Sequence, residues 1–278
     1  MRRWQFSKGH GTQNDFVVLL DRDNVLDPSA DDVRWLCDRR AGIGGDGLLR
    51  VVRARHVPEW DGDPDLWFMD YRNADGSLAQ MCGNGVRVFV RYLLEEGLAS
   101  GPDVDVATRA GLKPASVLAD GRVRVGMGPV AVRAGSVRVA TADGSSFDAT
   151  PADVGNPHAV SFGTRLGDLD LTRAPVWGPA TTFPDGVNLE FVEPVGERHI
   201  AMRVFERGVG ETRSCGTGTV AAAAATRARE ETAEGRGDGT WTVDVPGGRV
   251  EVELVGDEAF LTGPAVLVAH GEVALPNA

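Results

Sequence analysis

The hydrophobic positions of this 278-residue chain fall into many short apolar runs, broken by turns rich in glycine and aspartate. Runs of roughly four to eight apolar or alternating residues between such turns predict β-strands. The predicted strands cover residues 16–20, 48–52, 66–69, 137–140, 187–192, 199–205, 241–245, 249–255 and 259–262. The pattern therefore predicts a chain that is rich in sheet.

Apolar residues recur at helical spacing in three segments. The first follows a capping-box signal at Ser29 and places Cys37 on its apolar face, where we expect a buried core thiol. The second has a wide apolar face over residues 86–94 and stops at Gly97, and the third is the alanine-rich stretch 217–229. Because predicted strands flank the second and third helices on both sides, we expect these two helices to be largely buried.

Turn signals divide the chain further. Asp-Gly pairs at 120–121 and 143–144 predict hairpins. The stretch 126–129, Gly-Met-Gly-Pro, predicts a linker between two halves, and the polar, glycine-rich stretch 230–240 predicts a mobile loop.

The same short phrase, Cys-Gly-x-Gly, occurs once in each half and directly precedes a predicted helix each time. Cys82 and Cys215 open the two phrases. Asn73 lies nine residues before Cys82 (82 − 73), and Glu206 lies nine before Cys215 (215 − 206). This weak repeat of half the chain predicts a duplicated α/β unit with a cleft between its copies.

Composition narrows the class of function. The net charge of −11 argues against a nucleic-acid or anionic-membrane partner, and no apolar run is long enough to span a membrane. The N-terminus has no apolar segment typical of a signal peptide. Three cysteines without a CxxC pair fit the reducing cytoplasm better than a disulfide framework.

The sequence also argues against the common cofactors. Only Lys8 and Lys113 are available to form a Schiff base with pyridoxal phosphate, and neither is obviously placed for it. No glycine-rich phosphate-binding motif is present. We therefore expect an activity without a cofactor or a metal ion.

A cysteine at a helix start has a specific chemical use. The free N–H groups and the dipole favour negative charge there, and we expect them to lower the thiol pKa from about 8.5 toward about 3.5–7.5. The same donors can hold a substrate carboxylate while the neighbouring carbon loses its proton. Two such thiols suit stereoinversion, in which one base removes a proton and an acid on the opposite face returns one. Two buried structural cysteines, or a redox dithiol, are the alternatives that this phrase alone leaves open.

Eight motifs in this order resemble the diaminopimelate epimerase family over nearly the whole chain. They are residues 10–16, 42–47, 73–77, 81–85, 155–158, 187–191, 206–212 and 214–218. The resemblance implies a cofactor-independent isomerase that interconverts LL- and meso-diaminopimelate for lysine and peptidoglycan precursor synthesis. It implies an α/β (α+β) fold of two pseudo-symmetric domains, each a mostly antiparallel sheet or barrel wrapped round a central helix, with the active site in the cleft between them. We expect the domains to cover residues 1–127, joined by a C-terminal strand at about 266–278, and residues 128–265.

The resemblance also assigns roles to residues. It makes Cys82 and Cys215 the acid/base pair, with His158 and Glu206 tuning their thiols. It places the remaining site residues around the substrate: Asn14, Asn73, Gly83, Asn84, Asn156, Asn188, Glu206, Arg207, Gly216 and Thr217. A planar guanidinium suits a carboxylate, and amides can bind both an ammonium and a carboxylate. The chain departs from many relatives at Gln13, where they have a small residue, and at Gly47, where some have a glutamine that contacts the substrate.

Other interpretations stay open at this point. The asparagines could shape turns, and Glu206 and Arg207 could be a solvated charge pair. The same fold could serve an epimerase or racemase of proline, hydroxyproline or histidine, although a compact ring offers no distal charged end for Arg207. A non-catalytic thiol redox or binding protein is the third reading. A homodimer is compatible with the sequence, which does not fix the oligomeric state.

Overall fold

The computed structural model of the protein describes residues 2–163, 165–230 and 237–276. The chain divides into two compact units, Met1–Val125 with Gly263–Ala278, and Gly126–Thr262. The expected halves were residues 1–127 with 266–278, and 128–265. Each unit combines many strands with few helices, in agreement with the mixed, sheet-rich class that the hydrophobic pattern predicts.

The first unit is a mostly antiparallel sheet around one helix. Along the sheet, β19 pairs with β1, and pairing then runs in chain order from β1 to β6, parallel only at β2–β3 and β4–β5. Helix α2 (Gly83–Glu95) contacts every one of these strands, and the short helices are α1 (Ala30–Cys37) and the 3₁₀ turn η1 (Ala54–His56). The strands are β1 (Arg3–Gly11), β2 (Asn14–Leu20), β3 (Gly47–Arg53), β4 (Trp67–Asn73), β5 (Asp103–Thr108), β6 (Gly111–Val117) and β19 (Val266–Ala274).

The second unit has the same design, with a sheet around helix α3 (Gly216–Glu230). Parallel pairing occurs at β11–β13 and β14–β16. The pairs β8–β10, β9–β10, β9–β12, β10–β11, β13–β14, β14–β15, β16–β17 and β17–β18 are antiparallel. The 3₁₀ turns are η2 (Leu166–Asp168) and η3 (Ala180–Thr182). The strands are β8 (Ala131–Val132), β9 (Val137–Ala140), β10 (Ser146–Asp153), β11 (Pro157–Phe162), β12 (Val176–Gly178), β13 (Asn188–Gly196), β14 (His199–Glu206), β15 (Gly210–Thr212), β16 (Gly239–Val245), β17 (Gly248–Val255) and β18 (Glu258–Gly263), while β7 (Val123–Pro129) spans the division.

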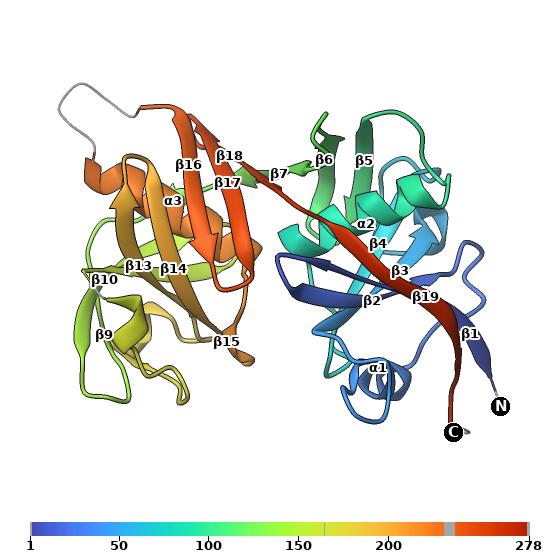
Figure 1. Ribbon diagram of the computed structural model, residues 1–278, viewed down its shortest axis with the longest axis horizontal. Helices are drawn as coiled ribbons and strands as arrows, with labels where there is room; N and C mark the ends of the chain where they lie inside the picture. Colours follow the sequence, from blue (N-terminus) through green and yellow to red (C-terminus); the bar gives the residue numbers. More distant parts are fainter. Residues whose placement is uncertain (1, 164, 231–236, 277–278) are drawn as a thin grey trace. The chain divides into compact units, whose positions relative to one another are not determined.

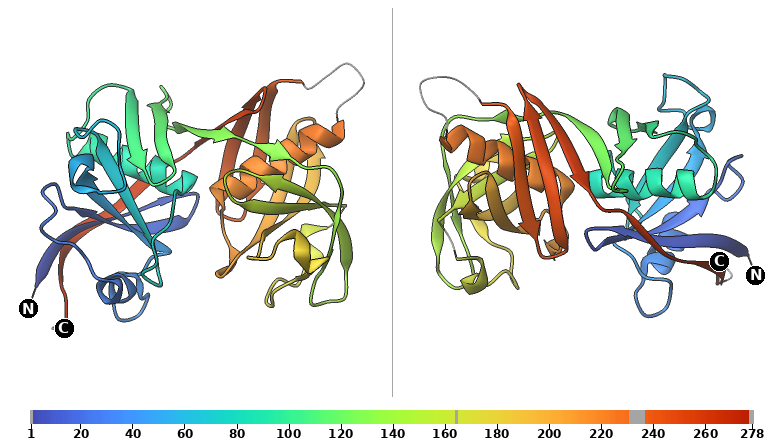
Figure 2. Two further views of the ribbon diagram at one scale, coloured as in Figure 1. Left: turned by 180° about the vertical axis from the view of Figure 1, so that it is seen from behind. Right: turned by 45° about the horizontal axis from the view of Figure 1, so that its top comes forward.

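The two central helices are buried in different ways. Helix α2 buries large side chains, among them Phe89 and Leu93, on a strongly apolar face. Helix α3 is buried nearly all round, and its run of alanines at 221–225 is inaccessible to solvent. Small side chains let strands approach the helix from several sides, which is the arrangement that Figures 1 and 2 show within this unit. The expectation that both helices are largely buried is confirmed.

Several local predictions are confirmed. Ser29 and Asp32 form the reciprocal capping box of α1, and Cys37 is a buried free thiol whose pKa burial raises to about 12. Helix α2 ends before Gly97, which adopts a φ of +64°. Strands β6 and β7 form the hairpin around Gly121, with Val117 opposite Val123.

Two stretches were expected to be irregular connections. Residues 126–129 were expected to form a linker; they begin at the division between the two units, where they belong to strand β7. Glycine weakens a strand without excluding it, and pairing with β6 supplies the hydrogen bonds that hold the start of this strand. Of the expected loop at 230–240, residues 231–236 lie outside the described residues. In the described part of the chain, no helix is long and apolar enough to cross a membrane.

Candidate active site

Cys82 caps helix α2 with its own side chain. It has extended backbone geometry, with φ −142° and ψ 118°, and its sulfur accepts the N–H of Gly85 at 3.4 Å. Asn84 does not cap the helix, because it is already the second helical residue. Gly83 and Asn84 therefore form the buried first turn behind the thiol. The thiol is half-buried.

Asn14 connects the Cys82 thiol to a fixed network. Its Oδ1 accepts from the Cys82 thiol at 3.6 Å and from Asn84 Nδ2 at 3.2 Å. Its Nδ2 donates to Asp46 Oδ2 at 2.8 Å, and Arg39 holds the other oxygen of Asp46 at 2.7 Å. An amide with a carboxylate on its nitrogen side cannot turn over without losing that bond. Asp46 thus keeps the oxygen of Asn14 directed at the sulfur.

A strained hairpin turn delivers Asn14 to this position. Thr12 and Gln13, between β1 and β2, have φ values of +51° and +61°, the left-handed region that two-residue hairpins require and that glycine or asparagine usually fills. The Thr12 hydroxyl accepts from Arg87 Nη2 at 3.0 Å. Arg87 is fully buried in α2, and burial lowers its pKa to about 10. A small residue such as glycine would adopt the positive φ at position 13 more easily than Gln13 does.

The structure places two further positions of the first unit in the β3–β4 hairpin. The side-chain nitrogen of Asn73 donates to Ser77 Oγ at 3.0 Å, in the turn that follows β4, so its observed contacts are turn contacts. Gly47 lies opposite Asn73 in the sheet. A Cβ at Gly47 would meet Arg72 O at 2.6 Å and the Tyr71 ring at 2.7 Å. This backbone therefore has no room for a glutamine side chain at position 47.

Cys215 occupies the corresponding place before helix α3. Its sulfur accepts the N–H of Gly218 at 3.4 Å, as Cys82 does from Gly85, and lies 3.5 Å from the Thr217 hydroxyl. Gly216 and Thr217 form the start of the helix. Unlike Cys82, Cys215 is buried, with 7% of its surface exposed.

A chain of polar side chains leads from Thr217 into the sheet. Asn156 Nδ2 donates to Thr217 Oγ1 at 3.3 Å, and Asn156 Oδ1 lies 2.9 Å from His158 Nε2. The other ring nitrogen of His158 lies 2.7 Å from Glu190 Oε1. His158 and Glu190 are both completely buried. The structure therefore joins His158 to the Cys215 thiol through Asn156 and Thr217.

The expected lowering of the thiol pKa is wrong for Cys215. Burial raises the pKa of this thiol well above its usual range, and the negative charges of Glu206 and Glu190 raise it further. The hydrogen bonds from Thr217 and Gly218 act in the opposite direction but are smaller effects. Burial and the two carboxylates therefore favour the protonated thiol at Cys215.

The other predicted residues of this unit hold one another in place. Asn188 Oδ1 accepts from the backbone N–H of Arg207 at 3.0 Å, and its Nδ2 donates to Pro157 O at 3.2 Å. Glu206 accepts from the hydroxyl of Thr212. Asn188 thus fixes the backbone at Arg207, and Glu206 lies close enough to act on the Cys215 thiol through its charge.

Arg207 is an exposed arginine beside a small cavity. Its Nη1 donates to Asp185 O at 3.1 Å, and no carboxylate pairs with it within the described residues. Gly186, at φ +86°, lies directly under its side chain, where a Cβ would come within 2.9 Å of Arg207 Cδ. The cavity has a volume of about 180 Å³, and Arg133 also lines it.

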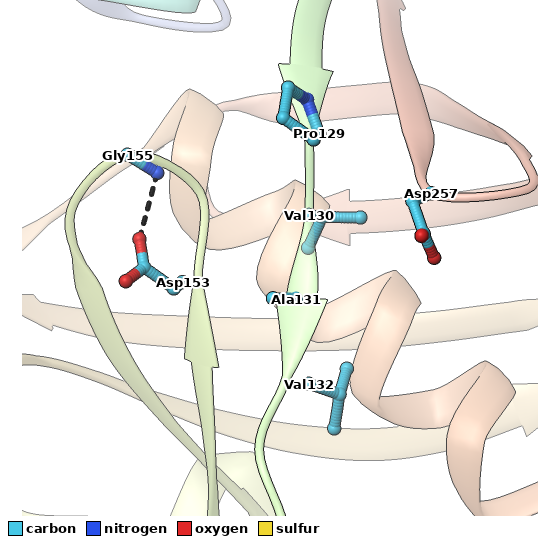
Figure 3. Close-up of a pocket in the computed structure, with 7 residues that line it drawn as sticks. All are labelled: Pro129, Val130, Ala131, Val132, Asp153, Gly155 and Asp257. Carbon is cyan, nitrogen blue, oxygen red and sulfur yellow. Dashed lines mark hydrogen bonds between the residues drawn. The ribbon is translucent and has the colours of Figure 1, made fainter.

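A larger cavity of the same unit, of about 390 Å³, contains none of the predicted residues (Figure 3). Among its lining residues, Asp153 accepts the N–H of Gly155 at 3.0 Å. Its lining is Pro129, Val130, Ala131, Val132, Asp153, Gly155 and Asp257. In the described residues, no group of three or more His, Cys, Asp or Glu side chains is arranged to hold a metal ion.

Sequence reasoning missed Glu190, although a signal was present. Asn188 was singled out because asparagine is unusual in a strand of β-forming residues, and Glu190 lies two positions later. Side chains two apart in a strand share a face. The same argument therefore applies to this glutamate, which lies between the buried Leu189 and Phe191.

Comparison with known proteins gives a consistent result along the chain. A model of the diaminopimelate epimerase family matches residues 6–132 and 150–268. The diaminopimelate epimerase of Streptomyces coelicolor is 51% identical over 276 residues, which cover 97% of this chain and 95% of that protein. The corresponding protein of Corynebacterium glutamicum is 49% identical, over 96% of this chain and 97% of its own length.

Solved structures with low sequence identity share the fold. A PhzF-family phenazine biosynthesis protein of Bacillus anthracis matches with a TM-score of 0.70 and 16% identity, over 99% of this chain and all of its own. A hydroxyproline epimerase of Agrobacterium vitis matches with a TM-score of 0.64 and 19% identity, over 99% of this chain and 94% of its own. These matches confirm the expected fold class.

Proposed function

This chain belongs to the diaminopimelate epimerase family, and we propose that it interconverts LL- and meso-diaminopimelate with two cysteine side chains and no cofactor. The observation that carries the proposal is the repeated thiol geometry. In each unit a cysteine precedes a buried helix, and its sulfur accepts the N–H of the glycine three residues on, at 3.4 Å in both cases. The relatives that match over almost their full length are diaminopimelate epimerases.

The proposed reaction moves one proton across one carbon. A thiolate removes the proton from the α-carbon, and the electron pair left behind spreads onto the neighbouring carboxylate. The second thiol then gives its proton to the opposite face of the same carbon and becomes the thiolate. The two sulfurs therefore exchange roles when the direction of the reaction reverses.

The helix starts supply what this intermediate needs. The first turns of α2 and α3 contain Gly83, Asn84, Gly216 and Thr217, whose neighbouring N–H groups have no partner inside the helix. We propose that these donors hold the reacting carboxylate. Their orientation is fixed before negative charge spreads onto the carboxylate, so no free energy is spent on reorienting them during the reaction.

Other residues have proposed roles in recognition and in tuning. The exposed Arg207 suits the carboxylate of the distal end, and Asn14, Asn73, Asn156, Asn188 and Glu206 are the proposed polar contacts to the rest of the substrate. His158 and Glu206 tune the Cys215 thiol, Glu206 through its charge and His158 through the chain that ends at Thr217.

The proposal is tested by proton exchange. The purified protein is incubated with LL-diaminopimelate in deuterated water under reducing conditions, and meso product with deuterium at the α-carbon is expected. Cys82→Ser and Cys215→Ser should each lose nearly all of this activity. Absence of both product and deuterium in the wild-type protein would refute the proposal.

A substrate panel separates the second candidate. The fold is shared with a hydroxyproline epimerase, so proline, hydroxyproline and histidine are the competitors to include. If the protein turned over any of these compounds faster than diaminopimelate, that compound would replace diaminopimelate as the proposed substrate. If both serine variants kept the main activity of the protein, a redox or binding function would replace catalysis.

The setting of the reaction is also a proposal. The thiols must stay reduced, and all three cysteines are free in the structure, so we infer that the enzyme works in the cytoplasm and supplies lysine and peptidoglycan precursor synthesis. A homodimer stays a prediction, which sedimentation of the purified protein would test.

A further inference from the structure

Glu190 is a buried carboxylate that the two-cysteine reaction does not require. It is completely inaccessible to solvent, in strand β13, between the buried Leu189 and Phe191. Its Oε1 lies 2.7 Å from His158 Nδ1, but its Oε2 has no hydrogen-bond partner among the described residues. A buried acid that is only half-satisfied costs stability, and such groups are found chiefly where they serve a function.

The partners of Glu190 define a direction of hydrogen bonding. Asn156 Oδ1 is an acceptor, so its 2.9 Å contact with His158 Nε2 requires the hydrogen to be on that ring nitrogen. His158 therefore donates to Asn156 Oδ1, while Glu190 Oε1 holds the other ring nitrogen.

This direction continues to the sulfur. With its oxygen turned toward His158, Asn156 directs its nitrogen to the Thr217 hydroxyl oxygen, at 3.3 Å. Because that oxygen accepts from Asn156, its own hydrogen is available to the Cys215 sulfur at 3.5 Å. The sulfur thus receives two donors, the Thr217 O–H and the Gly218 N–H, whenever it has given up its proton.

Glu190 also lies close to the helix start itself. A Cβ built on Gly218 would come within 2.8 Å of Glu190 Oε1 and within 3.3 Å of the Cys215 sulfur. The carboxylates that face the sulfur are Glu190 from β13 and Glu206 from β14, and the His158 ring from β11 lies behind Asn156. The carboxylate therefore acts on the thiol both through space and through the hydrogen-bond chain.

We infer that Glu190 is a positioning residue for Cys215: its carboxylate lies beside the sulfur, anchors His158 and, through Asn156, directs the Thr217 hydroxyl at the sulfur. The inference rests on the proposed function, because it assigns Glu190 a part in readying the acid of that reaction. It adds a residue that neither contacts the reacting carbon nor belongs to the cysteine phrases.

The experiment measures the thiol directly, without substrate. Wild-type protein, Glu190→Gln and Glu190→Ala are treated with iodoacetamide over a range of pH, and the alkylation of each cysteine is followed by peptide mass spectrometry. Glu190→Gln removes the charge but keeps a side chain that can bond to His158. We expect Cys215 of this variant to alkylate roughly threefold or more faster at pH 8, because alkylation follows the thiolate fraction. Cys82 in the same sample is the internal reference.

Turnover then separates positioning from charge. We expect kcat of Glu190→Ala to fall by roughly tenfold or more, with KM changed less, because the anchor of His158 is lost. Glu190→Gln should retain more kcat than Glu190→Ala. The matched control is Glu193→Gln on the same strand, whose carboxylate accepts from the Leu166 N–H and should leave both readouts unchanged.

Unchanged alkylation of Cys215 in Glu190→Gln would overturn the inference. The same holds for a folded Glu190→Ala that keeps the wild-type kcat. If Glu190→Ala does not fold, the alkylation of Glu190→Gln still decides. The two proposals fail separately, since an inactive wild-type protein would refute the epimerase assignment and leave the alkylation result intact.

Discussion

The two glycines that donate to the catalytic sulfurs offer a matched pair of substitutions. Gly218 and Gly85 have the same place in their helices, three residues after a cysteine. Their surroundings differ. A Cβ at Gly218 would lie 2.8 Å from Glu190 Oε1, whereas at Gly85 the nearest atoms are Cys82 Cβ and a methyl group of Leu49, both at 3.3 Å. Gly218→Ala should therefore do more damage than Gly85→Ala.

The magnitude follows from what must move. To reach an ordinary van der Waals distance from the new Cβ, the Glu190 carboxylate must move by about half an ångström. This movement stretches the 2.7 Å bond between Glu190 and His158, which lies in a buried site. A hydrogen bond to a charged group is worth about 1.5–3 kcal/mol, and alanine in a helix recovers at most about 1 kcal/mol relative to glycine. The net loss of unfolding free energy should be about 0.5–2 kcal/mol. If weaker hydrogen bonds from His158 through Asn156 to Thr217 raise the activation free energy by about 1.4 kcal/mol, kcat falls about tenfold.

Urea unfolding and steady-state epimerisation measure the two quantities. For Gly85→Ala we expect a change in unfolding free energy of less than about 0.5 kcal/mol and a smaller loss of kcat, because the Leu49 methyl can rotate away and helix propensity improves. If Gly218→Ala matches Gly85→Ala in both stability and kcat, the carboxylate is free to move and the reasoning about a locked Glu190 is wrong.

Three further changes test other parts of the site. Since the charge of Glu206 raises the pKa of Cys215, Glu206→Gln should increase the alkylation rate of Cys215 at pH 8 by roughly threefold or more, and an unchanged rate would contradict this. Asp46→Ala should lower kcat/KM by about tenfold, because the Asn14 amide loses its anchor and can turn its nitrogen to the thiol; a folded variant with wild-type kcat/KM would exclude this role. Gln13→Gly should raise Tm by about 1–4 °C by relieving a φ of +61°, and a lower Tm would show that the turn is not strained.

Local sequence signals located most of the regular structure. The capping box at Ser29 and the glycine stop at Gly97 depend on neighbours a few residues away, and the structure confirms them. Strand β1 (Arg3–Gly11) was missed because its sequence mixes polar residues and glycine. It exists because β2 and β19 supply hydrogen bonds on both sides, and β19 begins at Val266, more than 250 residues further along the chain. Residues 126–129 begin at the division between the two units, as a linker would, but their glycines gave no sign that they also belong to strand β7.

The sequence by itself determined that two cysteines stand at helix starts, because the glycine phrases and the apolar periods after them are local features. The protonation of Cys215 was decided only by the tertiary structure. A helix start taken alone favours the thiolate, but here burial and two carboxylates from other strands outweigh it. One of them, Glu190, bonds to a histidine 32 residues away. Electrostatic effects of this size depend on distance and burial in space, which no spacing along the chain encodes.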